Sequence, residues 1–411
     1  MPDADDQARP EAPVAVPLLA PRDGDVTPVV DPVELHAWRD RLAGGTDPVA
    51  LDAERASGYR YTARAYLVQL RRPDVGTALF DPIPLGDLSI LDDVLAGSEW
   101  VLHAANQDLA CLAELGLRPR TLFDTELAGR LAGLPRVGLG PLVERMLGLQ
   151  LSKGHGAADW STRPLPQEWL TYAALDVEVL VELRDAMAEL LQAQGKLEWA
   201  RQEFAAIVAA EPPAPRVDPW RRTSGIHKVR DRRTLAIIRE LWRARDDLAR
   251  RRDLAPHRVL PDSAIVAAAS AAPATEAELV GLPVFAGRMQ RRSAPYWLGA
   301  ITAGRTAPAS ELPDVRAAGD GPPAPAKWSA KDPAAAARLT AARAAMTELS
   351  ERVQVPVENL LAPDLLRRVL WQPPADSGVA AVAAALAERG ARPWQVELTA
   401  PVVHAALAAR S

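Results

Sequence analysis

The 411-residue sequence contains a single cysteine, Cys111, so it cannot form an intramolecular disulfide bond. This scarcity suits a reducing compartment, and we expect a cytoplasmic protein. Cys111 lies in an apolar run with helical spacing, which is typical of a small core residue and not of a reactive thiol. No group of Cys and His residues has the spacing of a zinc site, which excludes the common zinc modules.

The sequence also lacks an apolar run long enough to cross a bilayer. Its N-terminus is acidic and Pro-rich, whereas a signal peptide begins with basic residues and continues with an apolar stretch. These absences predict a protein without a membrane partner. The formal net charge is −5, so overall charge does not indicate a nucleic-acid-binding protein, and basic surfaces must be sought locally.

The length requires more than one hydrophobic core, and the first part of the chain reads as an α/β domain. Strand patterns alternate with helical patterns across residues 28–210, which predicts a mixed sheet flanked by helices. The expected strands cover residues 49–54, 64–71, 76–80, 99–104 and 121–124. The expected helices cover residues 32–43, 87–96, 106–117, 125–134, 140–148 and 167–193.

The remainder of the chain has few strand signals and reads as helical. Two segments in it share a pattern, because LAPHRVLPDSAIV from Leu254 resembles VPVENLLAPDLLRRV from Val355. Each follows a long helix, contains a proline and opens the next helix at Pro-Asp, which predicts two small helical bundles in tandem. The predicted segments are a disordered tail at 1–27, linkers at 211–219 and 304–333, and helical domains at 220–303 and 334–411.

The first candidate site lies at the end of the strand that begins at Val49. Asp52 and Glu54 are two residues apart, so their side chains point to the same face of the strand. Two like charges on one face repel each other unless a cation lies between them. The pair is therefore a candidate site for a divalent metal ion.

Two further motifs carry carboxylates in comparable settings. Asp108 opens a helix after the strand EWVLHA, where a helix-capping role is the structural alternative. His103 in that strand could act as a ligand or base, or could simply be buried. Tyr172 and Asp176 lie four residues apart on one face of a helix, beside its apolar face.

Together these motifs resemble the DEDD superfamily of 3′–5′ exonucleases, in the branch that has a Tyr four residues before the last Asp. The stretches HAANQDLACLAELG from His103 and DWSTRPLPQEWLTYAALDVEVLVELRD from Asp159 resemble the ribonuclease D exonuclease domain. The tandem helical units resemble its C-terminal HRDC domains, named for helicases and RNase D. The resemblance covers the chain from about residue 28 to its end.

This resemblance implies a catalytic set of Asp52, Glu54, Asp108, Tyr172 and Asp176, with the four carboxylates holding two divalent cations, Mg²⁺ or Mn²⁺. Asp52, Glu54 and Asp176 would hold one cation, and Asp52 and Asp108 the other. Carboxylate oxygens suit these hard cations. Tyr172 would orient the attacking water, because an ordinary Tyr pKa near 10 makes a poor base at neutral pH.

Contacts with nucleic acid are expected at aromatic and basic side chains near this set. Trp160 could stack on a terminal base and Arg163 could hold a phosphate, or the two could pack the loop and cap a helix. A basic run at the start of the first helical unit predicts a surface that follows the phosphate backbone. Its candidate contacts are Arg221, Arg222, Lys228, Arg232 and Arg233.

By this resemblance the chain shortens RNA, such as tRNA-like precursors, from the 3′ end and releases nucleoside 5′-monophosphates. A DNA exonuclease and a nucleic-acid-binding module with an inactive site remain as alternatives. The sequence shows no polymerase domain, which argues against a proofreading DNA exonuclease. The complete carboxylate set argues against an inactive binding module. The lack of a G-x-x-x-x-G-K-[ST] phosphate loop argues against a helicase. We expect a monomer. From domain order alone comes the further hypothesis that its domains form a ring or clamp that admits only single strands.

Overall fold

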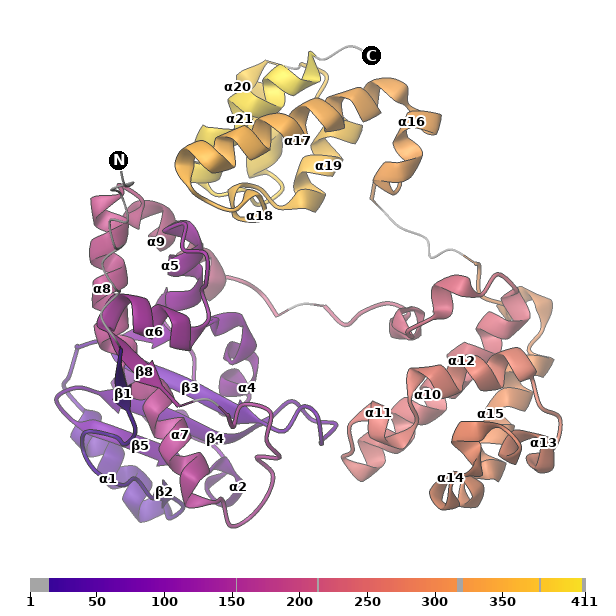
Figure 1. Ribbon diagram of the computed structural model, residues 1–411, viewed down its shortest axis with the longest axis horizontal. Coiled ribbons are helices and arrows are strands. Elements are labelled where there is room, and N and C mark those ends of the chain that lie inside the picture. The colour runs from indigo at the N-terminus through magenta and orange to yellow at the C-terminus, as the bar shows by residue number, and fades with distance from the viewer. Residues whose placement is uncertain (1–14, 153, 213, 316–320, 377, 409–411) are drawn as a thin grey trace, which may run out of the picture.

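The computed structural model describes residues 15–152, 154–212, 214–315, 321–376 and 378–408. An α/β domain is followed by two helical domains, which lie to one side of it and above it in Figure 1. This arrangement confirms the predicted fold class. In the described part of the chain, no helix is both long enough and apolar enough to span a membrane.

Strands of the α/β domain form a six-stranded mixed sheet and a small two-stranded sheet. The strands are β1 (Val16–Leu18), β2 (Pro28–Val29), β3 (Val49–Arg55), β4 (Ala65–Arg72), β5 (Gly76–Phe80), β6 (Glu99–Leu102), β7 (Thr121–Asp124) and β8 (Leu149–Leu151). The order in the larger sheet is β2-β5-β4-β3-β6-β7, and β1 pairs with β8. Strand β3 therefore lies inside the sheet, antiparallel to β4 and parallel to β6.

Helices of this domain cover the sheet on both sides (Figure 1). They are α1 (Pro32–Leu42), α2 (Pro82–Leu85), α3 (Asp92–Leu95), α4 (Leu109–Glu114), α5 (Thr125–Leu131), α6 (Leu139–Leu147), α7 (Gln167–Glu178), α8 (Leu180–Ala193) and α9 (Leu197–Val208). Short 3₁₀ turns η1 (Ser89–Leu91) and η2 (Ala105–Gln107) precede α3 and α4.

Two segments that were predicted to be single helices are interrupted in the structure. The segment 167–193 is broken at Val179, whose φ of −108° and ψ of −2° separate α7 from α8. The break lets α7 pack on β3, β4 and β5 while α8 packs against α5 and α6. The segment 87–96 is a 3₁₀ turn followed by one helical turn, a tighter path that buries Leu88, Leu91 and Leu95 completely.

The predicted tail at 1–27 is also wrong in its later part. Residues 1–14 lie outside the described residues, but β1 pairs in parallel with β8. Beyond β1, the carboxylate of Asp23 forms an ion pair with Arg71 of β4, and Arg22 pairs with Glu182 of α8. These partners are distant in the sequence, so composition alone could not reveal them.

The helical domains confirm the repeat. The first contains η3 (Pro219–Arg222), η4 (Ile226–Lys228), α10 (Arg232–Arg252), α11 (Pro256–Val259), α12 (Asp262–Ala271), α13 (Glu276–Val280), η5 (Pro283–Ala286), α14 (Arg288–Arg292), α15 (Ala294–Thr306) and η6 (Ala309–Glu311). The second contains η7 (Pro325–Lys327), α16 (Trp328–Lys331), α17 (Pro333–Val353), α18 (Val357–Leu360), α19 (Pro363–Trp371), α20 (Val379–Ala387) and α21 (Pro393–Leu407). Helices α10 and α17 each have 21 residues and are each followed by a left-handed residue, Asp253 or Gln354.

The linker predicted at 304–333 is shorter in the structure. Helix α15 continues to Thr306, and α16 already belongs to the second helical domain. Trp328 in α16 is completely buried, and its ring lies 4.9 Å from that of Trp371. The proline and glycine residues around Trp328 are typical of a linker, which explains the prediction. The contact with Trp371 instead places Trp328 in the second helical domain.

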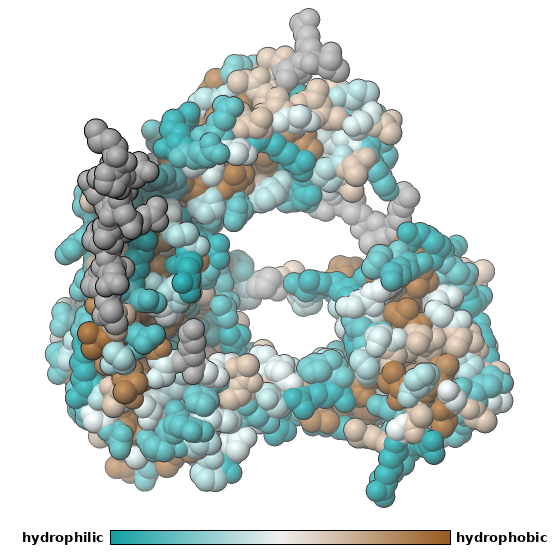
Figure 2. Space-filling view, in the orientation of Figure 1, coloured by the Kyte–Doolittle hydropathy of each residue, from teal (hydrophilic) through white to brown (hydrophobic). Residues whose placement is uncertain are grey.

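The two helical domains join the α/β domain in different ways. The second shares one continuous apolar core with it, and Trp394 of α21 stacks on Trp199 of α9 with ring centroids 5.0 Å apart. The indole of Trp394 also donates a hydrogen bond to Glu203 at 3.0 Å. The first helical domain has a core of its own. In Figure 2 the three domains enclose open space on either side of the segment that follows α9.

The first helical domain contacts the α/β domain through the hairpin loop between β3 and β4. One carboxylate oxygen of Asp253 accepts hydrogen bonds from the backbone N–H of Tyr61 and of Thr62 and from the Thr62 hydroxyl, at 3.1–3.2 Å. The phenol of Tyr61 donates to Asp246 at 3.0 Å. Arg258 donates to the carbonyl of Gly58 at 2.7 Å. This polar contact holds the loop that directly follows β3.

We predict that Asp253→Gly loosens this contact without unfolding either domain. Glycine accepts the left-handed backbone at this position, where φ is 46°, but it removes the acceptor of three hydrogen bonds. Hydrogen exchange should speed up at residues 58–62 while the sheet stays protected, and small-angle scattering should show a wider particle. Asp253→Asn keeps the acceptor oxygen and should behave like wild type. Equal exchange in all three proteins would contradict the prediction.

Candidate active site

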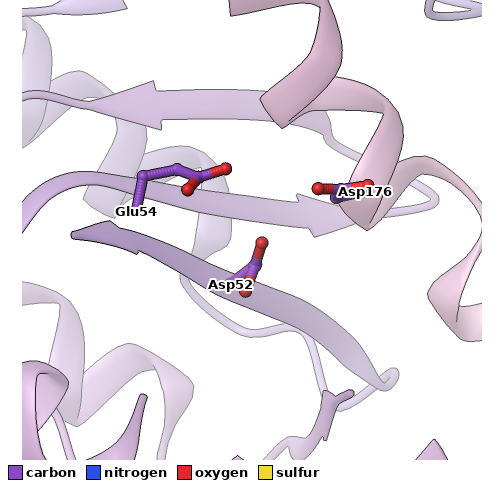
Figure 3. Close-up of side chains that lie close together, drawn as sticks. All are labelled: Asp52, Glu54 and Asp176. Carbon is purple, nitrogen blue, oxygen red and sulfur yellow. The ribbon is translucent and has the colours of Figure 1, made fainter. Parts of the chain in front are cut away.

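Three carboxylates from two elements converge beside the sheet. Asp52 and Glu54 project from the same face of β3, as the alternation of strand side chains predicts, and Asp176 projects from α7. One oxygen from each lies within 4.8 Å of the other two. Figure 3 shows the three carboxylates directed toward a common space. An all-oxygen set at this spacing fits a hard divalent cation.

Asp108 joins this group from the start of α4. It occupies the N-cap position, yet its side chain accepts no hydrogen bond from the helix backbone. Instead its carboxyl shares a hydrogen bond with Asp52, and one of its oxygens lies 3.3 Å from Nη2 of Arg55. The capping alternative is therefore excluded, and Asp108 faces the other carboxylates.

Ionisation of all four carboxyl groups together is unfavourable. Burial raises the pKa of Asp52 and Asp176, and burial with the charge of Asp52 raises the pKa of Glu54 to about 10 and that of Asp108 to about 8. Each shift has burial as its largest cause. Because repulsion adds to burial, the site favours either protons or cations between these oxygens.

Tyr172 lies one helical turn before Asp176 and contacts it. Burial, followed by the charge of Asp176, raises the pKa of Tyr172 well above its usual value. The phenol therefore keeps its proton at neutral pH and serves as a hydrogen-bond donor. The imidazole of His155 meets the Tyr172 ring edge-on, with ring centroids 5.6 Å apart.

The five residues line one cavity of about 530 Å³. This volume lies within the usual range for pockets that enclose small ligands, about 300–1,000 Å³. Residues around the five include Arg55, His103, Gln107, Arg136, Glu144 and Ser152. Burial lowers the pKa of His103 to about 4, and its Nδ1 lies 2.9 Å from the Thr125 hydroxyl, so the ring is neutral.

Comparison with known proteins identifies this frame. Family models match residues 26–192 as a 3′–5′ exonuclease, 234–301 as an HRDC domain and 321–407 as a 3′ to 5′ exonuclease C-terminal domain. Ribonuclease D of Gluconacetobacter diazotrophicus is 32% identical over 321 residues, which cover 75% of this chain and 78% of that protein. This chain belongs to the ribonuclease D family. It is an exoribonuclease of that family, as its sequence motifs predict.

Solved structures agree with this assignment to the ribonuclease D family. The crystal structure of Escherichia coli RNase D, described as an exoribonuclease involved in structured RNA processing, matches with a TM-score of 0.68 and 26% identity. That match covers 93% of this chain and 98% of the other. A crystal structure of a protein from Bifidobacterium adolescentis matches with a TM-score of 0.86 and 37% identity, covering 96% of this chain and 99% of that one.

Two predicted nucleic-acid contacts of this ribonuclease D family member are structural instead. Trp160 is completely buried, and its indole donates to the carbonyl of His155 at 3.2 Å. Arg163 binds both carboxylate oxygens of Asp81, at 2.7 and 2.8 Å, and the carbonyl of Tyr66. Neither side chain faces the cavity, because the loop that carries them folds back onto the sheet.

The basic run of the first helical domain is partly used within the domain. Arg221, Arg232 and Arg233 donate to carbonyls of the segment that follows α15, so part of their donor capacity is used within the domain. Their role as phosphate contacts stays a prediction. Arg222 and Lys228 are exposed, and within the described residues neither forms an ion pair. These two therefore stay as predicted contacts.

Sequence reasoning missed Arg55 and Arg136, both of which line the cavity. Arg136 lies in a loop after α5, where no local pattern distinguishes it from other exposed arginines. Arg55 follows Glu54 in a strand, and strict alternation would place it on the opposite face. Its position next to a candidate ligand was the one signal available.

We predict that the metal-free ribonuclease loses stability as the pH rises from about 6.5 to 8. Asp108 and Glu54 have pKa values of about 8 and 10 in the folded protein, whereas unfolded carboxyls titrate near pH 4. The folded state therefore holds protons that the unfolded state has released. Each such carboxyl costs about 1.4 kcal/mol per pH unit until its folded pKa is passed.

Thermal unfolding in EDTA checks this expectation. The Tm should fall across that range in wild type and fall less in Asp108→Asn, because an amide does not titrate. Mn²⁺ should raise the Tm more at pH 8 than at pH 6.5. Asp93→Asn alters an exposed aspartate of the same domain and serves as the control. A Tm that is independent of pH in wild type would contradict the assigned shifts.

Proposed function

We propose that this enzyme removes nucleotides one at a time from the 3′ ends of structured RNAs and releases nucleoside 5′-monophosphates. The observation that carries the proposal is the convergence of Asp52, Glu54, Asp108 and Asp176 with Tyr172 in one cavity. The Escherichia coli relative is an exoribonuclease involved in structured RNA processing, which supports structured RNA as the substrate class.

The carboxylates suit two divalent cations, Mg²⁺ or Mn²⁺. Asp52, Glu54 and Asp176 would hold one, since their oxygens lie within 4.8 Å of one another. Asp52 and Asp108 would hold the other, since their carboxyls are already in contact. When bound, such a pair of cations activates a water molecule and stabilises the leaving oxygen of the phosphodiester.

Tyr172 holds the reacting water in place. Its phenol stays protonated, so it cannot take a proton from the water at neutral pH. It can accept or donate a hydrogen bond at the mouth of the carboxylate cluster, where Asp176 fixes its orientation. The proton of the water passes instead to a basic group outside the phenol or to solvent.

We predict that a 5′-labelled single-stranded RNA is shortened from its 3′ end with Mg²⁺ or Mn²⁺ and not with EDTA. Asp52→Asn should abolish the ladder, because it removes a ligand that both cations share. Tyr172→Phe should lower kcat by about 10²-fold, the scale on which misplacing a reacting group slows an enzyme. Gel analysis of timed samples gives each rate.

A matched DNA strand tests the alternative substrate. Faster shortening of DNA than of RNA would overturn the RNA assignment while leaving the exonuclease assignment intact. A wild-type protein that binds RNA but shortens neither strand with any metal would identify a binding module with an inactive site.

Arg222 and Lys228 supply phosphate contacts on the first helical domain in this proposal. Both are exposed beside η3 and η4. We predict that the double change Arg222→Ala and Lys228→Ala weakens RNA binding similarly for all sequences. It should also reduce the slope of log affinity against log salt by about 2, because two fewer counterions are released. Fluorescence anisotropy across a salt series measures both quantities, and an unchanged slope would count against these contacts.

A further inference from the structure

Arg55 enters the carboxylate cavity at an irregularity in the sheet. The pairing of β3 with β4 joins Glu54 to Leu67 and then Arg55 to Ala65, so Tyr66 is skipped. The extra residue lies in β4, and an irregularity of this kind increases the local twist of the strand pair and is common beside active sites. Both Glu54 and Arg55 line the cavity, although a regular strand would place them on opposite faces.

The guanidinium of Arg55 is only partly used by the protein. Nη2 lies 3.3 Å from Oδ1 of Asp108, and within the described residues this is its one ion pair. A guanidinium carries five N–H donors, so most of them remain available. The side chain is 26% exposed, whereas that of Asp108 is 6% exposed. Arg55 therefore bridges the buried carboxylates and the open part of the cavity.

A cation beside Asp52 and Asp108 would replace Arg55 as the partner of Asp108. The cation then compensates the charge on Asp108, so Arg55 is free to leave Asp108. A phosphodiester brought to the cations places negative oxygens at the same spot. A guanidinium forks onto two such oxygens with good geometry, which a lysine ammonium cannot do.

We propose that Arg55 is a phosphate-binding residue of this active site. In the metal-free enzyme it pairs with Asp108, and in the loaded enzyme it holds a phosphate oxygen of the 3′-terminal nucleotide of RNA. This inference rests on the proposed function, because it assigns the ligand of the same cavity. Under this proposal the cations bind first and release Arg55 from Asp108, and RNA binds to Arg55 afterwards.

Binding measurements without turnover test the inference. A short RNA is titrated into wild type, Arg55→Gln and Arg55→Lys, in EDTA and in Ca²⁺, with Arg118→Gln as a matched control. Arg118 is an exposed arginine of the same domain outside the cavity. With Ca²⁺, Arg55→Gln should bind RNA about 10- to 100-fold more weakly, the scale of one charge-assisted hydrogen bond. Arg55→Lys should recover part of this affinity, and in EDTA the variants should differ little.

Calorimetric titration of Mn²⁺ without RNA separates this role from a purely structural one. If Arg55 competes with the cation for Asp108, Arg55→Gln should bind Mn²⁺ as tightly as wild type or more tightly. If Arg55 merely positions Asp108, the variant should bind Mn²⁺ more weakly, with RNA affinity in Ca²⁺ falling only as the cation is lost. That second pattern would overturn the inference, as would equal losses of RNA affinity in EDTA and Ca²⁺.

Activity distinguishes failure of the inference from failure of the proposed function. If wild type shortens RNA and Arg55→Gln has an unchanged KM and kcat, the assignment of Arg55 fails alone. If wild type does not shorten RNA, or if Asp52→Asn shortens it normally, the proposed function fails as well. Circular dichroism of each variant shows that the comparison concerns folded proteins.

Discussion

Repulsion among four carboxylates in one cavity, two of them buried and two partly buried, is the constraint on which this structure depends. Bringing Asp52, Glu54, Asp108 and Asp176 into one cavity is costly, because burial and like charge both disfavour ionisation. The surrounding elements are accordingly packed against several neighbours. Strand β3 lies inside the sheet, every residue of the neighbouring β4 is buried, and α7 packs across both strands. The fold supplies the free energy that keeps these oxygens together, ready for cations.

The two helical repeats contact the α/β domain through the same corner of their structure. The residue after the long first helix of each repeat is left-handed and contacts the α/β domain. Asp253 accepts hydrogen bonds from the hairpin loop, and the carbonyl of Gln354 accepts one from Lys196 at 3.2 Å. One copy is joined to the α/β domain by a shared apolar core, whereas the other has its own core and meets that domain at the loop after β3, through hydrogen bonds and the packing of Tyr61. The two repeats therefore differ in how they join the α/β domain: one through a shared apolar core, the other through contacts at a single loop.

The parts of the site that sequence predicted are those governed by local periodicity. A period of two puts Asp52 and Glu54 on one face, and a spacing of four puts Tyr172 over Asp176. Roles set by distant partners were not predictable in this way. Arg163 was predicted to bind a phosphate, but its guanidinium binds the carboxylate of Asp81, 82 residues away in the sequence. The helix break at Val179, the pairing of β1 with β8 and the entry of Arg55 into the cavity likewise depend on packing between remote segments.

The continuity of β3 connects the chemistry to the domain arrangement. Along this one segment lie two candidate cation ligands, Arg55, and then the loop that Asp253 holds. The same loop also contacts the segment that precedes α7, because Arg60 donates to the Ser161 hydroxyl at 2.7 Å. The loop therefore joins the strand that carries two candidate cation ligands to the helical domain on which Arg222 and Lys228 are the predicted RNA contacts.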